Sequence, residues 1–299
     1  MKYYSAYGII FQSGIELPEL APINPKNLIA DVHISLGKVP EKILNPEIEA
    51  VWYQMNAKQL LLKIESLGKY LVEDGNKIVI EPEPGIQESA IRIWLLGPCF
   101  AILLHQRNIF PLHSSGIHTP FGAVLFTGTT GLGKSTLLNT FLCRNYKMIS
   151  DDIVGISLFD DRVPIALPGF PRTKIWADSA QYFDIDLTDL PRIHPDFDKY
   201  SLKLGDAFIN ESQNIHRIYI LEQRDAHQLS LDYLSNFDKF QYLLLNTFGL
   251  SFIRKVSSRD KNFLLVSTIA KHLPIFLVNR PAKCHPEEVA DLMEMDFSG

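Results

Sequence analysis

The stretch Gly128-Thr-Thr-Gly-Leu-Gly-Lys134-Ser135 matches the phosphate-binding loop pattern GxxxxGK[ST] at every fixed position. It follows the apolar run at residues 123–127 and precedes a helix-like segment at residues 136–143. Glycines let the backbone curl so that successive N–H groups face a polyphosphate, and the helix start adds the positive end of its dipole. The sequence therefore predicts a strand, a nucleotide-binding loop and a helix in this order.

The side chains of this loop have distinct predicted roles. Lys134 is expected to reach the β- and γ-phosphates, and the Ser135 hydroxyl to hold Mg²⁺. The residues expected to bind the nucleotide are Gly128, Thr129, Thr130, Gly131, Leu132, Gly133, Lys134, Ser135 and Thr136. A glycine turn with an incidental lysine is the alternative, and the strand–loop–helix context argues against it. We therefore expect ATP and Mg²⁺ as cofactors.

Two adjacent carboxylates form the second strong feature. Asp151-Asp152 directly follows residues 146–150, which read as a strand. The chain bends at a strand end, so one carboxylate can meet a metal while the other faces an incoming hydroxyl. Phosphoryl transfer to an alcohol needs a carboxylate that accepts the hydroxyl proton. The pattern leaves open which of Asp151 and Asp152 binds the metal and which acts as the base; a solvated turn pair is the alternative.

Two further side chains are candidates for the same site. His113 precedes the core strand and can fold back beside the loop, where it would pair with an aspartate or contact phosphate. Arg172 follows the turn at residues 168–171, close to Lys174, and is predicted to neutralise transition-state charge. The alternatives are a structural histidine and an ordinary surface arginine.

Composition excludes several classes of function. The chain has 299 residues, 46% of them hydrophobic, and a formal net charge of −5, which gives no footprint for nucleic acid or an anionic membrane. The chain has three cysteines, and this small, odd number argues against a disulfide framework and indicates a reducing compartment. The N-terminus lacks the apolar segment of a signal peptide, and the run at residues 93–104 is expected to be too short to span a bilayer. We expect a cytoplasmic protein with no nucleic-acid or membrane partner.

The fold class expected from the pattern of elements is α/β. Residues 1–85 carry short strand-like runs, the first at residues 3–11, with a hairpin signal at Asp74-Gly75. A buried helix is expected at residues 89–106. The predicted domains are 1–108, β-rich with a linking helix, and 109–299, which holds the phosphate loop. Further predicted strands are 153–158, 163–167, 215–221 and 274–278, and further helices 237–248, 258–273 and 285–293; residues 168–214 read as a polar, proline-punctuated stretch.

Three motifs together resemble the HPr serine kinase family. They are Leu112-His-Ser-Ser-Gly116, the loop at residues 128–135 and Ile149-Ser-Asp-Asp-Ile-Val154, in this order. The resemblance implies a P-loop, HPr-kinase-like nucleotide-binding domain with a smaller β-rich N-terminal α+β domain. It also implies an ATP- and Mg²⁺-dependent serine kinase. The glutamate–arginine–glycine signature of true HPr kinases is not visible in the sequence.

The segment Leu167-Pro-Gly-Phe-Pro-Arg-Thr-Lys-Ile-Trp176 resembles a divergent branch of that family, found in biosynthetic clusters for lasso peptides and other ribosomal peptides. Tyr7-Gly8 and Leu17-Pro-Glu-Leu20 also look like that branch. The resemblance implies a peptide or small-protein substrate, with a serine near the C-terminus of a precursor peptide as acceptor. It places Asp151, Asp152 and His113 at the catalytic site, with Asp151 expected to bind the metal and Asp152 to act as the base.

Two other functions fit the same motifs. One is a non-catalytic nucleotide sensor or scaffold whose β-rich N-terminal part binds a partner. The other is a kinase for a small metabolite, such as free serine. The sequence also leaves open whether the chain forms a homo-oligomer.

Overall fold

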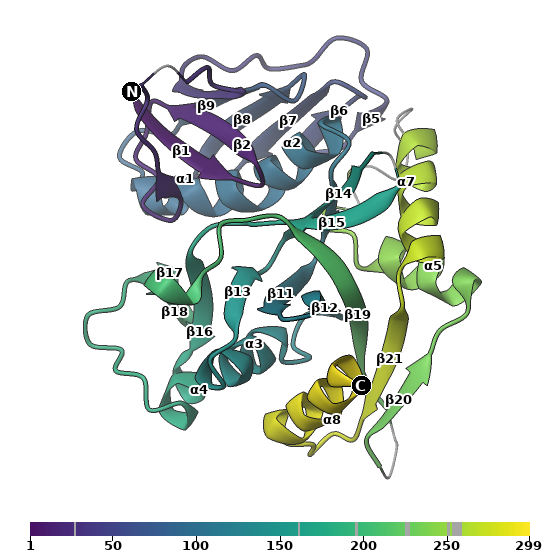
Figure 1. Ribbon diagram of the computed structural model, residues 1–299. Helices are drawn as coiled ribbons and strands as arrows, with labels where there is room; N and C mark the ends of the chain where they lie inside the picture. Colours follow the sequence, from purple (N-terminus) through teal and green to yellow (C-terminus); the bar gives the residue numbers. More distant parts are fainter. Residues whose placement is uncertain (27, 161, 195–196, 225–227, 250–251, 253–258) are drawn as a thin grey trace. The chain divides into compact units, whose positions relative to one another are not determined.

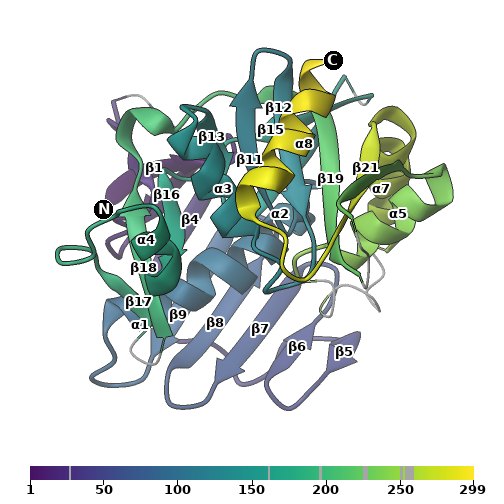
Figure 2. The same ribbon diagram turned by 90° about the horizontal axis from the view of Figure 1, so that it is seen from below.

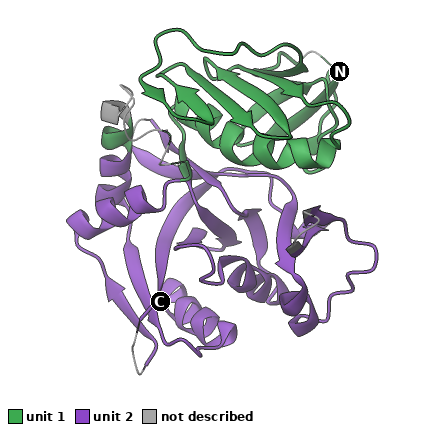
Figure 3. Ribbon diagram, turned by 180° about the vertical axis from the view of Figure 1, so that it is seen from behind, with its two compact units in different colours: residues 1–111, 248–265 green, residues 112–247, 266–299 purple. Residues whose placement is uncertain are grey.

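The computed structural model describes residues 1–299 except 27, 161, 195–196, 225–227, 250–251 and 253–258. The chain divides into two compact units (Figure 3). Unit 1 comprises Met1–Pro111 and Phe248–Leu265, and unit 2 comprises Leu112–Thr247 and Val266–Gly299. The boundary expected after residue 108 lies close to this division, whereas a second segment of unit 1 so late in the sequence was not expected.

Unit 1 is built on a nine-stranded sheet in the order β3-β1-β2-β4-β9-β8-β7-β6-β5. Neighbours are antiparallel except β2–β4 and β4–β9, which are parallel. The strands are β1 (Lys2–Ala6), β2 (Ile9–Ser13), β3 (Ala21–Pro22), β4 (Val32–Leu36), β5 (Ile48–Glu49), β6 (Tyr53–Met55), β7 (Gln59–Ile64), β8 (Gly68–Glu73) and β9 (Lys77–Pro82).

Two tight turns of unit 1 place consecutive residues in the left-handed region. Asp74 and Gly75 have φ values of 50° and 66° and connect β8 to β9, which confirms the predicted hairpin. Tyr7 and Gly8 have φ values of 55° and 70°, and the chain reverses there as well. The single strand expected over residues 3–11 is therefore wrong, because a two-residue turn of the hairpin type interrupts it.

One long helix covers a face of this sheet (Figure 1). It consists of α1 (Glu88–Trp94), the π-helical segment η1 (Leu95–Cys99) and α2 (Phe100–Gln106). Pro98 lies inside the π-helical turn, so the helix continues over 19 residues and is long and apolar enough to cross a membrane by length and composition. The expectation that this run is too short is thus corrected. Half of its apolar window is buried, and Phe100 stacks on Phe11 with ring centroids 4.8 Å apart, as in a core helix.

Unit 2 contains a mixed sheet with the order β14-β15-β19-β12-β11-β13, in which β21 lies beside β19 and β20 beside β21. A separate three-stranded sheet has the order β16-β18-β17. Two elements, β10 and α7, cross the boundary between the units. The elements that follow the long helix of unit 1 are β10 (Phe110–Leu112), β11 (Ser114–Thr119), β12 (Gly122–Thr127), α3 (Lys134–Cys143), β13 (Lys147–Ser150), β14 (Val154–Phe159), β15 (Val163–Leu167), β16 (Arg172–Trp176), α4 (Ala177–Tyr182), β17 (Arg192–His194), β18 (Phe197–Lys203), η2 (Gly205–Ala207), β19 (Gln213–Gln223), β20 (Ser230–Tyr233), α5 (Asn236–Leu245), α7 (Arg259–His272), β21 (Ile275–Arg280) and α8 (Pro286–Ser298).

Four strands of the mixed sheet run in the same direction. β12, β19 and β21 pair in parallel. β11 is antiparallel to both β12 and β13, so β13 also runs with β12. The carboxyl ends of β12, β13, β19 and β21 consequently meet at one edge of the sheet, which is where ligands bind in open α/β sheets.

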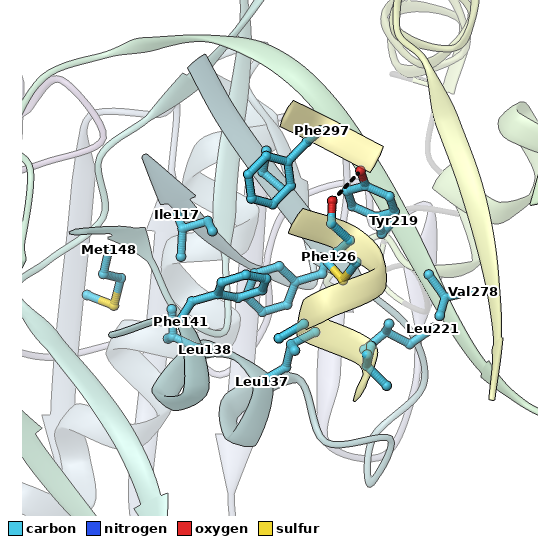
Figure 4. Packing of buried hydrophobic residues seen from close by; sticks show 14 residues of the cluster. Ile117, Phe126, Leu137, Leu138, Phe141, Met148, Tyr219, Leu221, Val278 and Phe297 are labelled. Atoms are coloured by element: carbon cyan, nitrogen blue, oxygen red, sulfur yellow. Dashed lines mark hydrogen bonds between the residues drawn. The ribbon is translucent and has the colours of Figure 1, made fainter. Parts of the chain in front are cut away.

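The core of unit 2 lies between this sheet and the helices α3 and α8 (Figures 2 and 4). Its centre is aromatic, with Phe141 of α3 between Phe126, Tyr146 and Phe297 at centroid distances of 5.9, 5.5 and 6.2 Å. At the end of α3, Arg144 pairs with carboxylates of α8, including Glu294 at 2.6 Å. The aromatic contacts and the ion pairs together fix α3, and with it the preceding loop.

Phe141→Ala should destabilise unit 2 strongly. The side chain is fully buried, so its removal loses transfer free energy and leaves a cavity, with a cost of about 3–5 kcal/mol. Urea denaturation followed by far-UV circular dichroism measures the loss. Phe159→Ala is the matched control, since Phe159 is 59% exposed and should change the free energy of unfolding by less than about 0.5 kcal/mol. Equal effects of the two substitutions would contradict the packing described here.

The three-stranded sheet occupies the stretch for which the sequence indicated no strand. Thr173 and Ile175 of β16 are buried, whereas Arg172, Lys174 and Trp176 are more exposed. This is the period-two alternation of a half-buried strand. The cations and prolines around it disguised the pattern, because Ile175 is the only apolar residue on the buried face of this strand.

Candidate active site

The topology of unit 2 brings the three sequence motifs to one edge of the sheet. The phosphate loop begins where β12 ends, and Asp151 begins where β13 ends. His113 directly precedes β11, which runs antiparallel to both strands, so it lies at the same edge. A strand–loop–helix unit is therefore flanked by one histidine and two carboxylates.

The loop conformation depends on its glycines. Gly128, Gly131 and Gly133 have φ values of 150°, 91° and 82°, in the region that side chains rarely adopt. A Cβ on Gly128 would lie 2.6 Å from the carbonyl oxygen of Leu221 on the neighbouring β19. Gly133 is the N-cap of α3, so the first turn of that helix opens directly onto the loop. These features fit a backbone cradle for phosphate oxygens.

Lys134 lies inside the cradle. Its side chain is largely buried, and Nζ donates to the carbonyl oxygens of Gly128 at 2.6 Å and Thr129 at 3.3 Å. Burial lowers the pKa of Lys134, partly offset by Asp152 and Asp151. A buried ammonium within a ring of backbone groups is suited to binding an anion. The donor set of backbone N–H groups, an amine and the Ser135 hydroxyl fits a polyphosphate with Mg²⁺.

Asp151 is held by a complete set of hydrogen bonds. Oδ1 accepts from Ser115 Oγ at 2.7 Å and from the backbone N–H of Asp152 at 3.0 Å. Oδ2 accepts from Thr173 Oγ1 at 2.8 Å and from the backbone N–H of Lys174 at 3.2 Å. A carboxylate has about four lone-pair sites, and all of them are used. These contacts favour a positioning role that ties β13 to β16; direct metal ligation by Asp151 stays a prediction.

Asp152 is the carboxylate that remains accessible, with a side chain 34% exposed. Its backbone is left-handed, with φ at 72°. Oδ2 pairs with Lys174 Nζ at 2.6 Å, and Oδ1 lies 3.6 Å from His113 Nε2. Burial raises the pKa of Asp152, but the charge and hydrogen bond of Lys174 outweigh it and bring the pKa to about 2. Asp152 is therefore an ionised acceptor at neutral pH.

His113 contributes a neutral imidazole to the site. Its pKa is lowered by burial and next by the nearby charge of Lys134, although Asp152 opposes the shift. The ring is thus available as a hydrogen-bond partner beside Asp152 rather than as a cation. This agrees with the predicted neighbourhood of His113; its catalytic role stays a prediction.

Two lysines of the three-stranded sheet complete the surroundings of Asp152. In the sequence, Lys174 stands out only as a cation close to Arg172. Burial lowers the pKa of Lys199, and the charge of Lys174 lowers it further. Lys199 Nζ lies 5.2 Å from the centre of the Trp176 ring. The signal that could have found both is the alternation of cations along β16 and β18.

The structure places Arg172 elsewhere on β16. Its Nη1 donates to Ser201 Oγ at 3.1 Å, two residues before its cross-strand partner Lys203 on β18. This contact ties Arg172 to the neighbouring strand, and the transition-state role expected for it stays a prediction. Lys174, two residues further along the strand, is the cation that meets Asp152.

Within the described part of the chain, no group of three histidine, cysteine or carboxylate side chains is placed to hold a metal ion. Mg²⁺ needs only one or two protein oxygens when waters and substrate phosphates supply the others. The predicted Ser135 ligand in the first turn of α3 is compatible with this mode.

A cavity of about 170 Å³ adjoins the loop. It is lined by Leu132 and Gly133 of the loop, Thr136 and Leu137 of α3, Leu221, Arg280, Pro286 and Val289. An apolar lining with one guanidinium suits a planar aromatic group, such as a nucleobase.

Lys174→Met should raise the pKa of Asp152, because the charge and the hydrogen bond of Lys174 no longer oppose the effect of burial. In the native protein, the lowered pKa of Asp152 means that its ion pair with Lys174 stabilises the fold fully at pH values above the ordinary pKa of an aspartate. This stabilisation is lost as the pH falls through about 2. Carbon-detected NMR should show that the Asp152 carboxyl of the native protein stays ionised down to the lowest pH at which the protein is folded. In Lys174→Met, the midpoint of the Asp152 titration should lie at a higher pH. Lys147→Met, at an exposed position on β13, is the control. An unchanged midpoint in Lys174→Met would rule out this origin of the shift.

Comparison with solved structures shows a distant structural similarity to a kinase/phosphatase. No family model matches the chain, and no curated protein sequence matches it. A solved structure of the HPr(Ser) kinase/phosphatase from Coxiella burnetii is similar with a TM-score of 0.35 and 13% identity, over 62% of this chain and 89% of that one. At these values the similarity does not assign a fold or an activity to this chain.

Proposed function

We propose that this protein is an ATP- and Mg²⁺-dependent kinase that phosphorylates a hydroxyl group, a serine of a peptide or small protein. The observation that carries the proposal is the placement of an ionised, accessible Asp152 at the edge of the sheet that also presents the glycine loop and the buried Lys134. Nucleotide binding alone would need the loop but not the half-buried Asp152–Lys174 ion pair beside it.

The chemistry assigned to these residues is a direct transfer. The acceptor oxygen forms a bond to the γ-phosphorus, the bond from that phosphorus to the β,γ-bridging oxygen breaks, and ADP leaves. Asp152 accepts the hydroxyl proton, and Lys174 holds the carboxylate in position. Lys134 neutralises charge on the β- and γ-phosphates. Mg²⁺, when bound through Ser135, supplies further neutralisation of the phosphate oxygens.

A pKa of about 2 makes Asp152 a weak base, which suits this reaction. Phosphoryl transfer passes through a loose transition state, and catalysis rests mainly on positioning and electrostatics. An aspartate fixed by a lysine orients the hydroxyl and takes its proton late. The rigid support comes from Asp151, whose hydrogen bonds tie together β11, β13 and β16.

The acceptor class is supported by the motif resemblance alone, which favours a serine near the C-terminus of a ribosomal precursor peptide such as a lasso-peptide precursor. Incubation with γ-labelled ATP, Mg²⁺ and precursor peptides encoded in the gene neighbourhood tests this. Phosphoserine on a peptide, located by mass spectrometry, is the expected result. Transfer only to free serine or another metabolite would replace the peptide by a small molecule, and binding of ATP without any transfer would favour a sensor.

A further inference from the structure

The three-stranded sheet of unit 2 presents a face of unusual charge. Along β16 and β18, alternate residues point to the same side, and the antiparallel register aligns three cross-strand pairs. These pairs are Arg172 with Lys203, Lys174 with Ser201, and Trp176 with Lys199. We call these six positions the basic ladder. It holds four cations and no carboxylate, in a chain whose net charge is −5.

The two ends of the ladder differ in their surroundings. Lys174 pairs with Asp152, and Lys199 is close enough to Lys134 to lower the pKa of that lysine. This part of the ladder therefore belongs to the phosphate-transfer site. Arg172 and Lys203 lie two residues beyond Lys174 and Ser201, a displacement of about 7 Å along each strand.

The outer pair places two cations side by side on neighbouring strands. Arg172 and Lys203 are directly opposite each other, and like charges in that arrangement destabilise a sheet. Lys203 is exposed, and no described carboxylate lies within ion-pair distance of it. The Arg172 guanidinium extends along the ladder to Ser201 Oγ, toward the position of Lys174. Two adjacent cations at this end of the ladder form a natural site for an anionic side chain.

We propose that Arg172 and Lys203 bind an acidic side chain of the phosphate acceptor, two residues away from the hydroxyl that is phosphorylated. The spacing follows from the ladder, because an extended peptide also places alternate side chains about 7 Å apart. An acceptor hydroxyl beside Asp152 and Lys174 then sets a glutamate or aspartate two positions along the peptide against the outer pair. This inference rests on the proposed kinase function for the position of the hydroxyl.

Short synthetic peptides with a single serine test the proposal. One carries glutamate two residues before and after the serine, a second carries glutamine there, a third lysine, and a fourth moves the glutamates next to the serine. With γ-labelled ATP, kcat/KM for the first peptide should exceed that for the second and fourth by about tenfold, and the third should be the poorest acceptor. Equal kcat/KM for the first two peptides would overturn the proposal.

Lys203→Glu is the discriminating variant. It should remove the preference for the first peptide and favour the lysine peptide instead, whereas Lys147→Glu, at an exposed position on β13, should leave the preference intact. Replacement of the like-charge pair by Arg172 and a carboxylate should also raise Tm by about 1–3 °C, which verifies that the variant is folded. A rise in KM for ATP with an unchanged peptide preference would assign the pair to nucleotide phosphates and overturn the proposal.

A binding assay separates this inference from the kinase proposal. The four peptides are labelled with a fluorophore, their serine is replaced by alanine, and fluorescence anisotropy is measured. Selective binding of the first peptide that Lys203→Glu abolishes, without phosphorylation of any serine peptide, would support the acidic subsite and refute the kinase. Phosphorylation without a charge preference would support the kinase and refute the acidic subsite. No binding and no phosphorylation would refute the subsite.

Discussion

Asp152→Asn should lower kcat/KM for phosphoryl transfer by about 10²–10⁴-fold, the usual contribution of a positioned proton acceptor. Asparagine keeps the size of the side chain but cannot take the hydroxyl proton or neutralise Lys174, now 2.6 Å from Asp152 Oδ2. The affinity for ATP should fall far less, because the loop and Lys134 are unchanged. Label transfer to the best acceptor peptide and calorimetric titration with ATP and Mg²⁺ measure the two effects separately.

Asp160→Asn provides the matched control for this substitution. Asp160 is exposed between β14 and β15, and its φ of 48° places it, like Asp152 at 72°, in the left-handed region that asparagine tolerates. Neither variant should therefore suffer backbone strain. If Asp152→Asn retained activity within a factor of a few, the chemistry assigned to Asp152 would be wrong and the nucleotide sensor would become the better account.

Asp151→Asn should behave differently from Asp152→Asn. Each oxygen of its carboxylate accepts one side-chain hydroxyl, from Ser115 or Thr173, and one backbone N–H group. In asparagine an amide nitrogen replaces one of these oxygens and cannot accept the hydrogen bonds made there. We expect a loss of stability of about 1–3 kcal/mol together with a loss of activity, since buried donors become unsatisfied. Chemical denaturation beside the transfer assay distinguishes the two aspartates. Equal stability of the two variants would contradict a positioning role for Asp151.

The central part of this site could be predicted from the sequence because its residues follow one another along the chain. A strand, the loop and α3 occupy consecutive positions, and Asp151 ends the strand that follows. Local pattern therefore suffices to place the loop and both aspartates at one sheet edge. The choice between the two aspartates could not be made in this way, since it depends on Ser115 and Thr173 filling the lone pairs of Asp151.

Other features depend on contacts between distant parts of the sequence. Lys174 meets Asp152 only because the β14–β15 hairpin returns the chain to the end of β13, and Lys199 joins it through the register of β18 against β16. The order of strands in unit 1 and the place of residues 248–265 in that unit are likewise non-local. Apolar periodicity specifies which face of an element is buried, but not which element covers it.

Lys134→Ala should abolish catalysis and weaken ATP binding by about 10–100-fold, which corresponds to the loss of charge-assisted hydrogen bonds worth about 1.5–3 kcal/mol. The protein without nucleotide should not be destabilised to the same extent. Burial lowers the pKa of Lys134, so the folded protein holds this ammonium at a cost that the carbonyl oxygens of Gly128 and Thr129 offset only in part. The cost is recovered when phosphate oxygens surround the amine.

Thermal unfolding with and without ATP and Mg²⁺ tests both halves of this prediction. In the native protein, saturating nucleotide should raise Tm in proportion to RT ln(1 + [L]/Kd), and in Lys134→Ala most of that rise should disappear while Tm without nucleotide is maintained or increased. Lys147→Ala removes an exposed lysine of β13 and should preserve the nucleotide-dependent rise. A large fall in Tm of Lys134→Ala without nucleotide would mean that the buried ammonium stabilises the loop itself. In that case the lysine would be a structural element of the cradle, and its burial would no longer argue for phosphate binding.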